Sequence, residues 1–116
     1  MEINKEVLKG NIDTILLAML SGSPMYGYEL AKSARMKSGG HFELKEGTMY
    51  LALKRLEQQA MIESYWGDEG GAGGRRKYYR ITAEGISHYG QKREEWRFVR
   101  QILDRFLKED EDNESY

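Results

Sequence analysis

Apolar residues recur at helical spacing in four stretches of the chain, and each stretch predicts a helix. The first covers residues 5–20 and is stopped by the serines, glycine and proline of residues 21–24. A second, shorter helix is predicted over residues 26–36, a third over residues 46–59, and a long final one over residues 83–108. Helices therefore make up most of the predicted structure.

Two runs rich in aromatic and β-branched residues, 61–66 and 76–82, predict β-strands. The segment between them, residues 67–74, holds five glycines in eight residues, so the strands are expected to form a hairpin with a mobile tip. Apolar and polar residues also alternate over residues 41–44, which predicts one further short strand.

The order of these elements, three helices followed by a hairpin, is that of a winged helix-turn-helix domain. The predicted fold class is accordingly mostly α with a small β-hairpin wing, extended by a long C-terminal helix. We expect residues 1–82 to form the winged helix-turn-helix DNA-binding domain, residues 83–108 a dimerisation helix and residues 109–116 a disordered acidic tail.

Length and composition narrow the class of protein. A chain of 116 residues corresponds to one domain, and 40% hydrophobic with 32% charged residues is a globular balance. The absence of cysteine excludes disulfide scaffolds, thiol enzymes and cysteine-ligated zinc modules. The sequence has neither an apolar run of about 20 residues nor a secretory signal at its start, so a cytoplasmic protein without a membrane partner is expected.

The net charge of −1 is unevenly distributed along the chain. Five of the 19 acidic residues lie in residues 109–116, which contain no basic residue. The remainder carries 18 basic against 14 acidic residues, so its formal charge is about +4. The main part of the chain is therefore compatible with a nucleic-acid partner.

The predicted third helix has one apolar and one polar face. At about 100° per residue, one sector holds Met49, Leu53, Leu56 and Ala60, which predicts the buried face. The opposite face is small, polar and basic, as expected of a helix that enters the major groove of DNA. The residues predicted to contact DNA from this helix and from the start of the second helix are Gly47, Thr48, Tyr50, Leu51, Lys54, Arg55 and Tyr26.

Basic residues also stand beside the tip of the predicted hairpin. Arg75, Arg76 and Lys77 follow the glycine-rich segment and are suited to contact the DNA backbone or the minor groove. A basic helix face or a basic turn alone is an ordinary solvated surface. The two together, at the spacing of a recognition helix and a wing, favour double-stranded DNA as the partner.

Several motifs follow one another along the chain: Leu8-Lys9-Gly10, Pro24-Met25-Tyr26-Gly27-Tyr28-Glu29-Leu30, Glu46-Gly47-Thr48-Met49-Tyr50, Leu53-Lys54-Arg55-Leu56-Glu57, Ile62-Glu63-Ser64, and Gly73-Gly74-Arg75-Arg76-Lys77-Tyr78-Tyr79. In this order they resemble the PadR family of transcriptional regulators over residues 8–107. The resemblance implies a dimeric winged-helix repressor, and the single long final helix is similar to that of the small-sized branch of the family. Within that branch, Ser64-Tyr65-Trp66-Gly67-Asp68-Glu69 and Trp96 resemble a multidrug-sensing repressor. Ala60 stands where the family usually has glycine, and Leu51 where it often has proline.

The predicted final helix carries an apolar seam. The members of the seam are spaced by seven, three and four residues, which predicts pairing with another helix, and a second copy of the chain is the expected partner. The resulting homodimer would place two recognition helices on a pseudo-palindromic promoter operator. The residues predicted at the dimer interface are Leu8, Ile12, Tyr89, Trp96, Val99, Ile102, Leu103 and Phe106.

Trp96 has two alternative roles at this interface. Facing its own copy across a two-fold axis, it would sandwich a planar hydrophobic effector between two rings; alternatively, it is a packed residue of the seam. Lys92 and Arg100 lie one turn to either side, which favours a neutral or anionic ligand. The predicted ligand-binding residues are Trp96, Lys92, Val99 and Arg100.

No combination of residues predicts catalysis. The glycine-rich segment lacks the Gly-Lys-Ser/Thr ending of a phosphate-binding loop, and neither His41 nor His88 is accompanied by metal ligands or a nucleophile. A non-enzymatic protein without cofactor or metal is expected. Two other functions stay open: a winged-helix module that binds another protein, and a small-molecule-binding dimer without a role on DNA.

Overall fold

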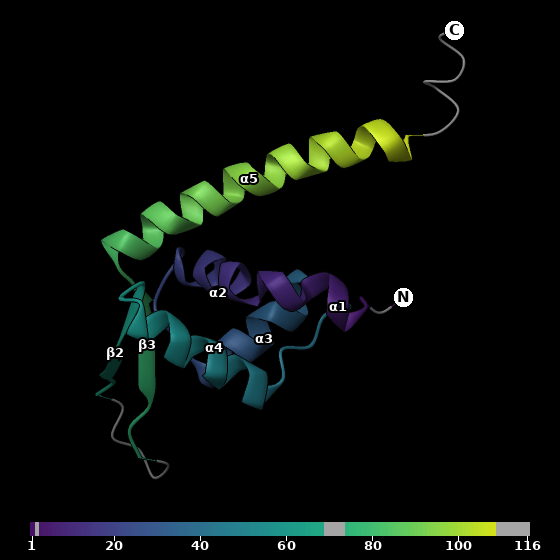
Figure 1. The fold of residues 1–116 in the computed structure, drawn as a ribbon. Helices are drawn as coiled ribbons and strands as arrows, with labels where there is room; N and C mark the ends of the chain where they lie inside the picture. The colour runs from purple at the N-terminus through teal and green to yellow at the C-terminus, as the bar shows by residue number, and fades with distance from the viewer. Residues whose placement is uncertain (2, 69–73, 109–116) are drawn as a thin grey trace, which may run out of the picture.

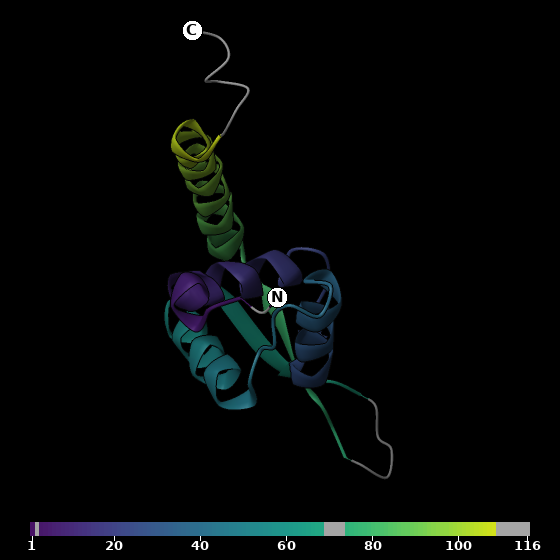
Figure 2. The same ribbon diagram turned by 90° about the vertical axis from the view of Figure 1, so that its right-hand side faces the viewer.

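Three helices pack against a small sheet, and one long helix extends from this domain (Figures 1 and 2). The computed structural model describes residues 1, 3–68 and 74–108. The order of elements confirms the winged helix-turn-helix with a long final helix. The elements are α1 (Lys5–Leu8), the 3₁₀ helix η1 (Lys9–Asn11), α2 (Ile12–Leu20), β1 (Met25–Tyr26), α3 (Gly27–Lys37), α4 (Glu46–Gln58), β2 (Ile62–Trp66), β3 (Lys77–Ile81) and α5 (Ala83–Leu107).

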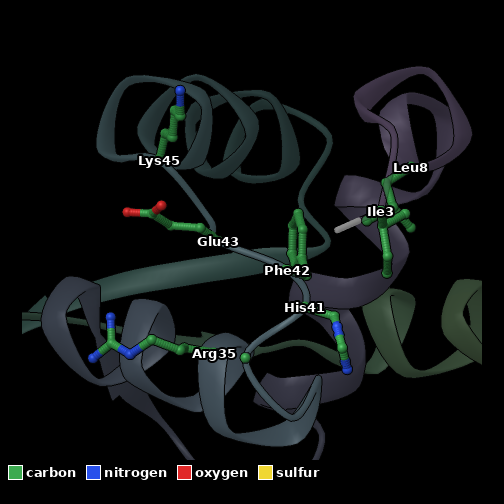
Figure 3. A pocket seen from close by; sticks show the side chains of 8 residues that line it. Ile3, Leu8, Arg35, His41, Phe42, Glu43 and Lys45 are labelled. Carbon is green, nitrogen blue, oxygen red and sulfur yellow. The ribbon is translucent and has the colours of Figure 1, made fainter. Parts of the chain in front are cut away.

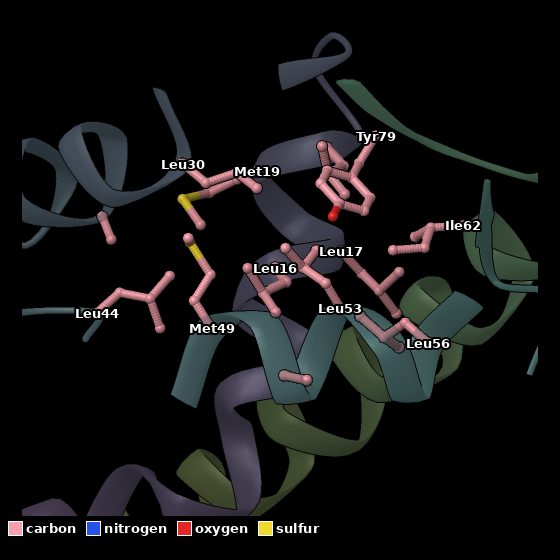
Figure 4. Packing of buried hydrophobic residues seen from close by; sticks show 13 residues of the cluster. Leu16, Leu17, Met19, Leu30, Leu44, Met49, Leu53, Leu56, Ile62 and Tyr79 are labelled. Carbon is pink, nitrogen blue, oxygen red and sulfur yellow. The ribbon is translucent and has the colours of Figure 1, made fainter. Parts of the chain in front are cut away.

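The hydrophobic core lies where α2, α3 and α4 meet the inner face of the sheet (Figure 4). Helix α2 is the central element, because it contacts α3, α4 and α5, and its neighbouring residues Leu16 and Leu17 are both fully buried. Burial of these side chains supplies most of the driving force for packing the helices together. The buried hydrophobic residues are Leu16, Leu17, Met19, Leu20, Leu30, Ala34, Leu44, Met49, Ala52, Leu53, Leu56, Ile62 and Tyr79.

The sheet has three antiparallel strands in the order β1–β3–β2. The predicted hairpin is confirmed as the pair β2–β3, while most of its predicted mobile tip, residues 69–73, lies outside the described residues. In this register Tyr26 and Tyr65 both lie opposite Tyr78. Because side chains alternate along a strand, these three rings share the outer face, whereas Tyr79 points into the core.

The first predicted helix is interrupted. Helix α1 ends at Leu8 and α2 begins at Ile12, with η1 between them. Gly10 and Asn11 are poor helix formers, and Asn11 leaves helical geometry with φ −118° and ψ 1°. The prediction of one continuous helix over residues 5–20 was therefore wrong at this point.

Residues 41–44 do not form a strand, contrary to the prediction. Leu44 is buried and Phe42 half-buried. The alternation of apolar and polar residues therefore arises from an extended segment that packs on the core without a strand partner. The Phe42 amide instead donates to Ser38 Oγ, at 3.0 Å. The third strand is β1, whose residue Tyr26 was predicted to begin the second helix.

Ala60 lies beyond the end of α4 and is exposed, although the sequence predicted it on the buried face. Its φ of 60° places it in the left-handed region. The amide of Ala60 donates to the Glu57 carbonyl at 3.0 Å, and the Met61 amide donates to the Leu56 carbonyl at 3.0 Å, which closes the helix in a Schellman turn.

Helix α5 starts in close contact with this turn. Thr82 Oγ1 accepts from the Gly85 amide at 3.1 Å and donates to the Ala60 carbonyl at 2.7 Å. The first part of α5 packs on α2, and its far end extends away from the domain (Figures 1 and 2). Residues 109–116, predicted as a disordered acidic tail, lie outside the described residues. Within the described part, no helix has the length and apolar character needed to cross a membrane.

Candidate nucleic-acid interface

Helix α4 presents an exposed face opposite its buried one. Met49 and Leu53 anchor the helix in the core with 3% and 1% of their surface exposed. On the opposite side, Gly47, Leu51 and Lys54 are exposed, and Leu51 retains 67% of its accessible surface. The structure thus provides the small, partly basic helix face that the sequence predicted for a DNA groove.

One flank of α4 is fixed to α3 by Tyr50. The Tyr50 hydroxyl lies so close to Gly27 that any Cβ at that glycine would collide with it. The residue as a whole is 44% exposed. Tyr50 therefore joins the two helices of the helix-turn-helix and stays partly accessible for the predicted DNA contact.

The other flank of α4 is tied to α2 by an ion pair. Arg55 Nη2 lies 2.6 Å from Asp13 Oδ1, and Arg55 Nε donates to Asp13 Oδ2 at 3.3 Å. This hydrogen bond and the charge of Asp13 raise the pKa of Arg55, which stays protonated. Sequence reasoning placed Arg55 on this flank but missed Asp13, because no local signal marks a partner 42 residues away.

The wing brings Arg76 against the helix-turn-helix. The Gly67 amide donates to the Arg76 carbonyl at 2.7 Å, so strand pairing continues one step beyond Trp66 and Lys77. The Arg76 guanidinium lies 4.8 Å from the centroid of the Tyr26 ring. Two residues predicted separately as DNA contacts, Tyr26 and Arg76, are therefore one stacked unit.

Lys77 and Arg75 are placed differently from Arg76. Alternation along β3 directs Lys77 to the inner side of the sheet, where its Nζ lies 5.8 Å from the Tyr79 ring centroid. Burial raises the pKa of the Tyr79 phenol, and the Tyr50 phenol and the Glu57 carboxylate add to this effect. Arg75 precedes β3, and its Nε donates to the Gly67 carbonyl at 3.4 Å.

A row of tyrosines that the sequence analysis missed crosses the outer face of the sheet. The Tyr26 ring lies 5.4 Å from Tyr78 and 6.3 Å from Tyr28, and the Tyr78 ring lies 5.7 Å from Tyr65, centroid to centroid. Arg80 covers the Tyr65 ring at 5.0 Å and also pairs with Glu63 at 2.7 Å. The sequence signal for this face is the alternation that places Arg76, Tyr78 and Arg80 at every second position.

A separate groove of about 430 Å³ lies between α5 and the N-terminal helices. It brings together Trp96 and Lys92, two of the residues predicted to bind a ligand, whereas Val99 and Arg100 do not line it. Lys92 Nζ lies 3.7 Å from Glu95 Oε2, so its charge is partly countered. The residues that line the groove are Leu8, Gly10, Asn11, Thr14, Ile15, Ala18, Tyr89, Lys92, Arg93, Glu95 and Trp96.

The predicted dimerisation seam is largely exposed along the far half of α5. Trp96, Leu103 and Phe106 have 51%, 45% and 81% of their surface exposed. Val99 and Ile102 beside them are half-buried. Of the other residues predicted at the dimer interface, Tyr89 and Leu8 line the groove and Ile12 packs against the core.

A further pocket, of about 400 Å³, lies beside the start of α4. Figure 3 shows Phe42 between Ile3 and Leu8 on one side and Glu43 and Lys45 on the other. Within the described part of the chain, no three histidine, cysteine or carboxylate side chains are grouped as a metal ion would require. The pocket therefore offers a mixed polar and apolar surface without a metal-binding set.

An exposed helix face, a basic wing and a three-stranded sheet define a winged helix-turn-helix domain of the class that binds DNA. The sequence profile of the transcriptional regulator PadR-like family matches residues 16–91. The chain belongs to this family of transcriptional regulators, which confirms the resemblance found in its motifs.

Solved structures of regulators are similar over most of the chain. A transcriptional regulator from Clostridium thermocellum is 43% identical with a TM-score of 0.83, and the match covers 91% of this chain and 99% of that one. A PadR family transcription regulator from Clostridium difficile R20291 is 46% identical with a TM-score of 0.72, over 83% and 97% of the two chains. An uncharacterised protein from Lysinibacillus sphaericus is 35% identical over 105 residues, 90% of this chain and 95% of its own.

Proposed function

We propose that the protein is a cytoplasmic homodimeric repressor that binds a pseudo-palindromic promoter operator and is released by a planar hydrophobic effector. The observation that carries the proposal is the exposed face of α4, with Lys54 at its middle, in the same domain as the wing with Arg76. A helix of this kind fits a major groove about 12 Å wide, and the wing reaches the flanking backbone. The proposal assigns no catalysis and no cofactor to the chain.

Fluorescence anisotropy with DNA from upstream of the protein's own gene tests the DNA-binding part. Specific binding should exceed binding to scrambled DNA by at least about 10³ and weaken steeply with salt. Lys54→Ala and Arg76→Ala should each weaken binding without unfolding the protein. Lys37→Ala is the matched control, because Lys37 lies in the last turn of α3 and lines a pocket with residues of α1 and α2 rather than of α4 or the wing. Wild-type affinity in both test variants would contradict the assignment of α4 and the wing to DNA.

The homodimer is proposed from the exposed seam of α5. Monomeric proteins rarely leave a contiguous apolar surface of this kind in water. A second copy placed along the seam would bury Leu103 and Phe106 and put two α4 helices on one DNA site. Sedimentation velocity should therefore report a dimer, and Leu103→Asp a monomer. Gln101→Asp is the control: Gln101 is exposed, about 160° around α5 from Leu103, and an acidic group there should leave the dimer intact.

The effector site is proposed at the groove beside Trp96. Its volume of about 430 Å³ suits a small molecule, and its tryptophan offers a flat apolar surface. In a Trp66→Phe background, Trp96 is the only tryptophan left, so quenching of its fluorescence by the aromatic anion anilinonaphthalene sulfonate reports on this groove. Trp96→Ala, followed by the fluorescence of the dye itself, should abolish that binding, whereas unchanged dye binding would place the pocket elsewhere. A ligand between the subunits would weaken DNA binding by changing the spacing of the two α4 helices.

A further inference from the structure

The ion pair between Arg55 and Asp13 fixes the orientation of a guanidinium group at the edge of the DNA-binding helix. Two hydrogen bonds, at 2.6 and 3.3 Å, join Nη2 and Nε of Arg55 to the two carboxylate oxygens of Asp13. Such a two-point contact holds the plane of the guanidinium as well as its position. The carboxylate belongs to α2, which is held in turn by the core through Leu16 and Leu17.

The guanidinium keeps donors that this pair does not use. Arginine has five N–H groups, and Asp13 accepts from two of them. The Arg55 side chain is 51% exposed, so the outer edge of the guanidinium is open to a ligand with acceptor oxygens. Arg55 lies one turn after Leu51, at the border of the helix face proposed to enter the major groove.

Other basic side chains lie close to Arg55. A groove of about 530 Å³ lies between α4 and the N-terminal helices, and Arg55 is among the residues that line it. Lys9 and Lys45 line it together with Arg55, while Glu6 and Glu43 are the acidic groups of its lining. The side chains of α4 itself that line it are Thr48, Leu51 and Arg55, all on one flank of the helix.

We infer that Asp13 is a positioning residue for DNA binding: it holds Arg55 so that the free N–H edge of the guanidinium contacts a backbone phosphate beside α4. This inference rests on the proposed DNA-binding function. It gives Arg55 a role in affinity and register rather than in reading bases, since phosphate contacts carry no sequence information of their own.

The inference makes a prediction about sign. Asp13 is a negative charge close to the proposed DNA surface, so by charge alone its neutralisation should strengthen binding to DNA. If Asp13 positions Arg55, its neutralisation should weaken binding, even though the protein becomes more positive. The two effects are opposed, and a single isosteric substitution separates them.

The experiment measures anisotropy of a short, fluorescein-labelled, mixed-sequence DNA duplex at several salt concentrations, because a phosphate contact does not need the operator. Asp13→Asn should weaken binding at low salt at least about fivefold. Arg55→Ala should weaken binding as well and lower the slope of log K against log salt by about 0.9, the loss of one phosphate contact. In the Arg55→Ala background, Asp13→Asn should no longer weaken binding.

Two further variants keep the test decisive. Glu6→Gln removes a carboxylate charge from the same groove and should strengthen binding slightly, as the matched control for charge alone. Arg55→Lys keeps the charge but loses the two-point contact, so it should bind DNA more weakly than wild type. If Asp13→Asn does not fold, this variant tests the same ion pair by changing Arg55 instead of Asp13.

The inference is overturned if Asp13→Asn binds as well as or better than wild type while folded by circular dichroism, or if Arg55→Ala leaves the salt slope unchanged. The failure of the proposed function looks different. In that case the wild-type protein itself shows no salt-dependent affinity for DNA, and both proposals are rejected together.

Discussion

Replacing Ala60 by glycine should stabilise the protein, although glycine usually destabilises a structured segment. Ala60 has φ 60°, in the left-handed region that disfavours a side chain by about 1–2 kcal/mol. Its methyl group is exposed, so removing it forfeits little buried surface. The hydrogen bonds of the turn run through its backbone, from the Ala60 amide to the Glu57 carbonyl and from Thr82 Oγ1 to the Ala60 carbonyl, and the substitution keeps both.

The expected magnitude is the difference between two opposing effects. Relief of the left-handed strain is opposed by the greater freedom of glycine in the unfolded chain, about 0.5–1 kcal/mol. The free energy of unfolding should therefore rise by about 0.5–1 kcal/mol in Ala60→Gly. With a urea m-value of about 1–3 kcal/mol/M, the unfolding midpoint should move up by about 0.2–1 M.

Urea unfolding followed by circular dichroism is the assay, with all variants at one protein concentration because association raises apparent stability. The matched control is Gln59→Gly, one residue earlier. Gln59 has φ −86°, so the glycine there relieves no strain and should lower stability by about 0.5–1 kcal/mol. Opposite shifts in neighbouring positions support the reasoning. A loss of stability in Ala60→Gly equal to that in Gln59→Gly would refute it.

Three further predictions follow from close contacts in the structure. Gly85→Ala should destabilise the protein by more than about 3 kcal/mol, because the added Cβ would collide with a backbone carbonyl. Gly90→Ala has open space around the added Cβ and should stabilise the protein by about 1 kcal/mol in the same urea assay. Burial raises the pKa of Tyr79, so the folded state keeps a proton that the unfolded chain loses above pH about 10. The free energy of unfolding should therefore fall as the pH rises past that value, and it should fall less in Tyr79→Phe. Tyr26→Phe keeps the ring under Arg76 and should bind DNA within about twofold of wild type in anisotropy titrations, whereas Tyr26→Leu should lose about two- to fivefold; equal losses would remove the stacking argument.

The features that the sequence predicted correctly are those with a local period. The buried face of α4 follows from the helical spacing of Met49, Leu53 and Leu56, and the β2–β3 pair from two aromatic runs around a glycine-rich segment. Each of these patterns lies within about a dozen neighbouring residues. Burial of one face, which is the physical cause of the pattern, acts on the same residues. Where alternation arose without a partner strand, as at Phe42 and Leu44, the same signal was misleading.

The features that the sequence did not show depend on residues far apart in the chain. Strand β1 is two residues long and exists because β3 lies beside it, so Met25 and Tyr26 carry no strand signal of their own. The space that a side chain at Gly27 would need is filled by Tyr50, from the next helix. Such contacts form only once α3, α4 and the sheet have packed together, and no periodicity in one segment records them.

Lys54 and Arg55 show what this difference means for a binding site. The two residues are adjacent, carry the same charge and were both predicted to contact DNA, but successive residues on a helix point about 100° apart. Lys54 lies on the exposed face of α4, whereas Arg55 turns to its flank and meets Asp13. A lysine on the open face acts as a mobile charge, while an arginine held by a carboxylate acts through its orientation. Substitutions at the two positions therefore test different properties: at Lys54 the charge presented to the groove, and at Arg55 the geometry that α2 imposes on α4.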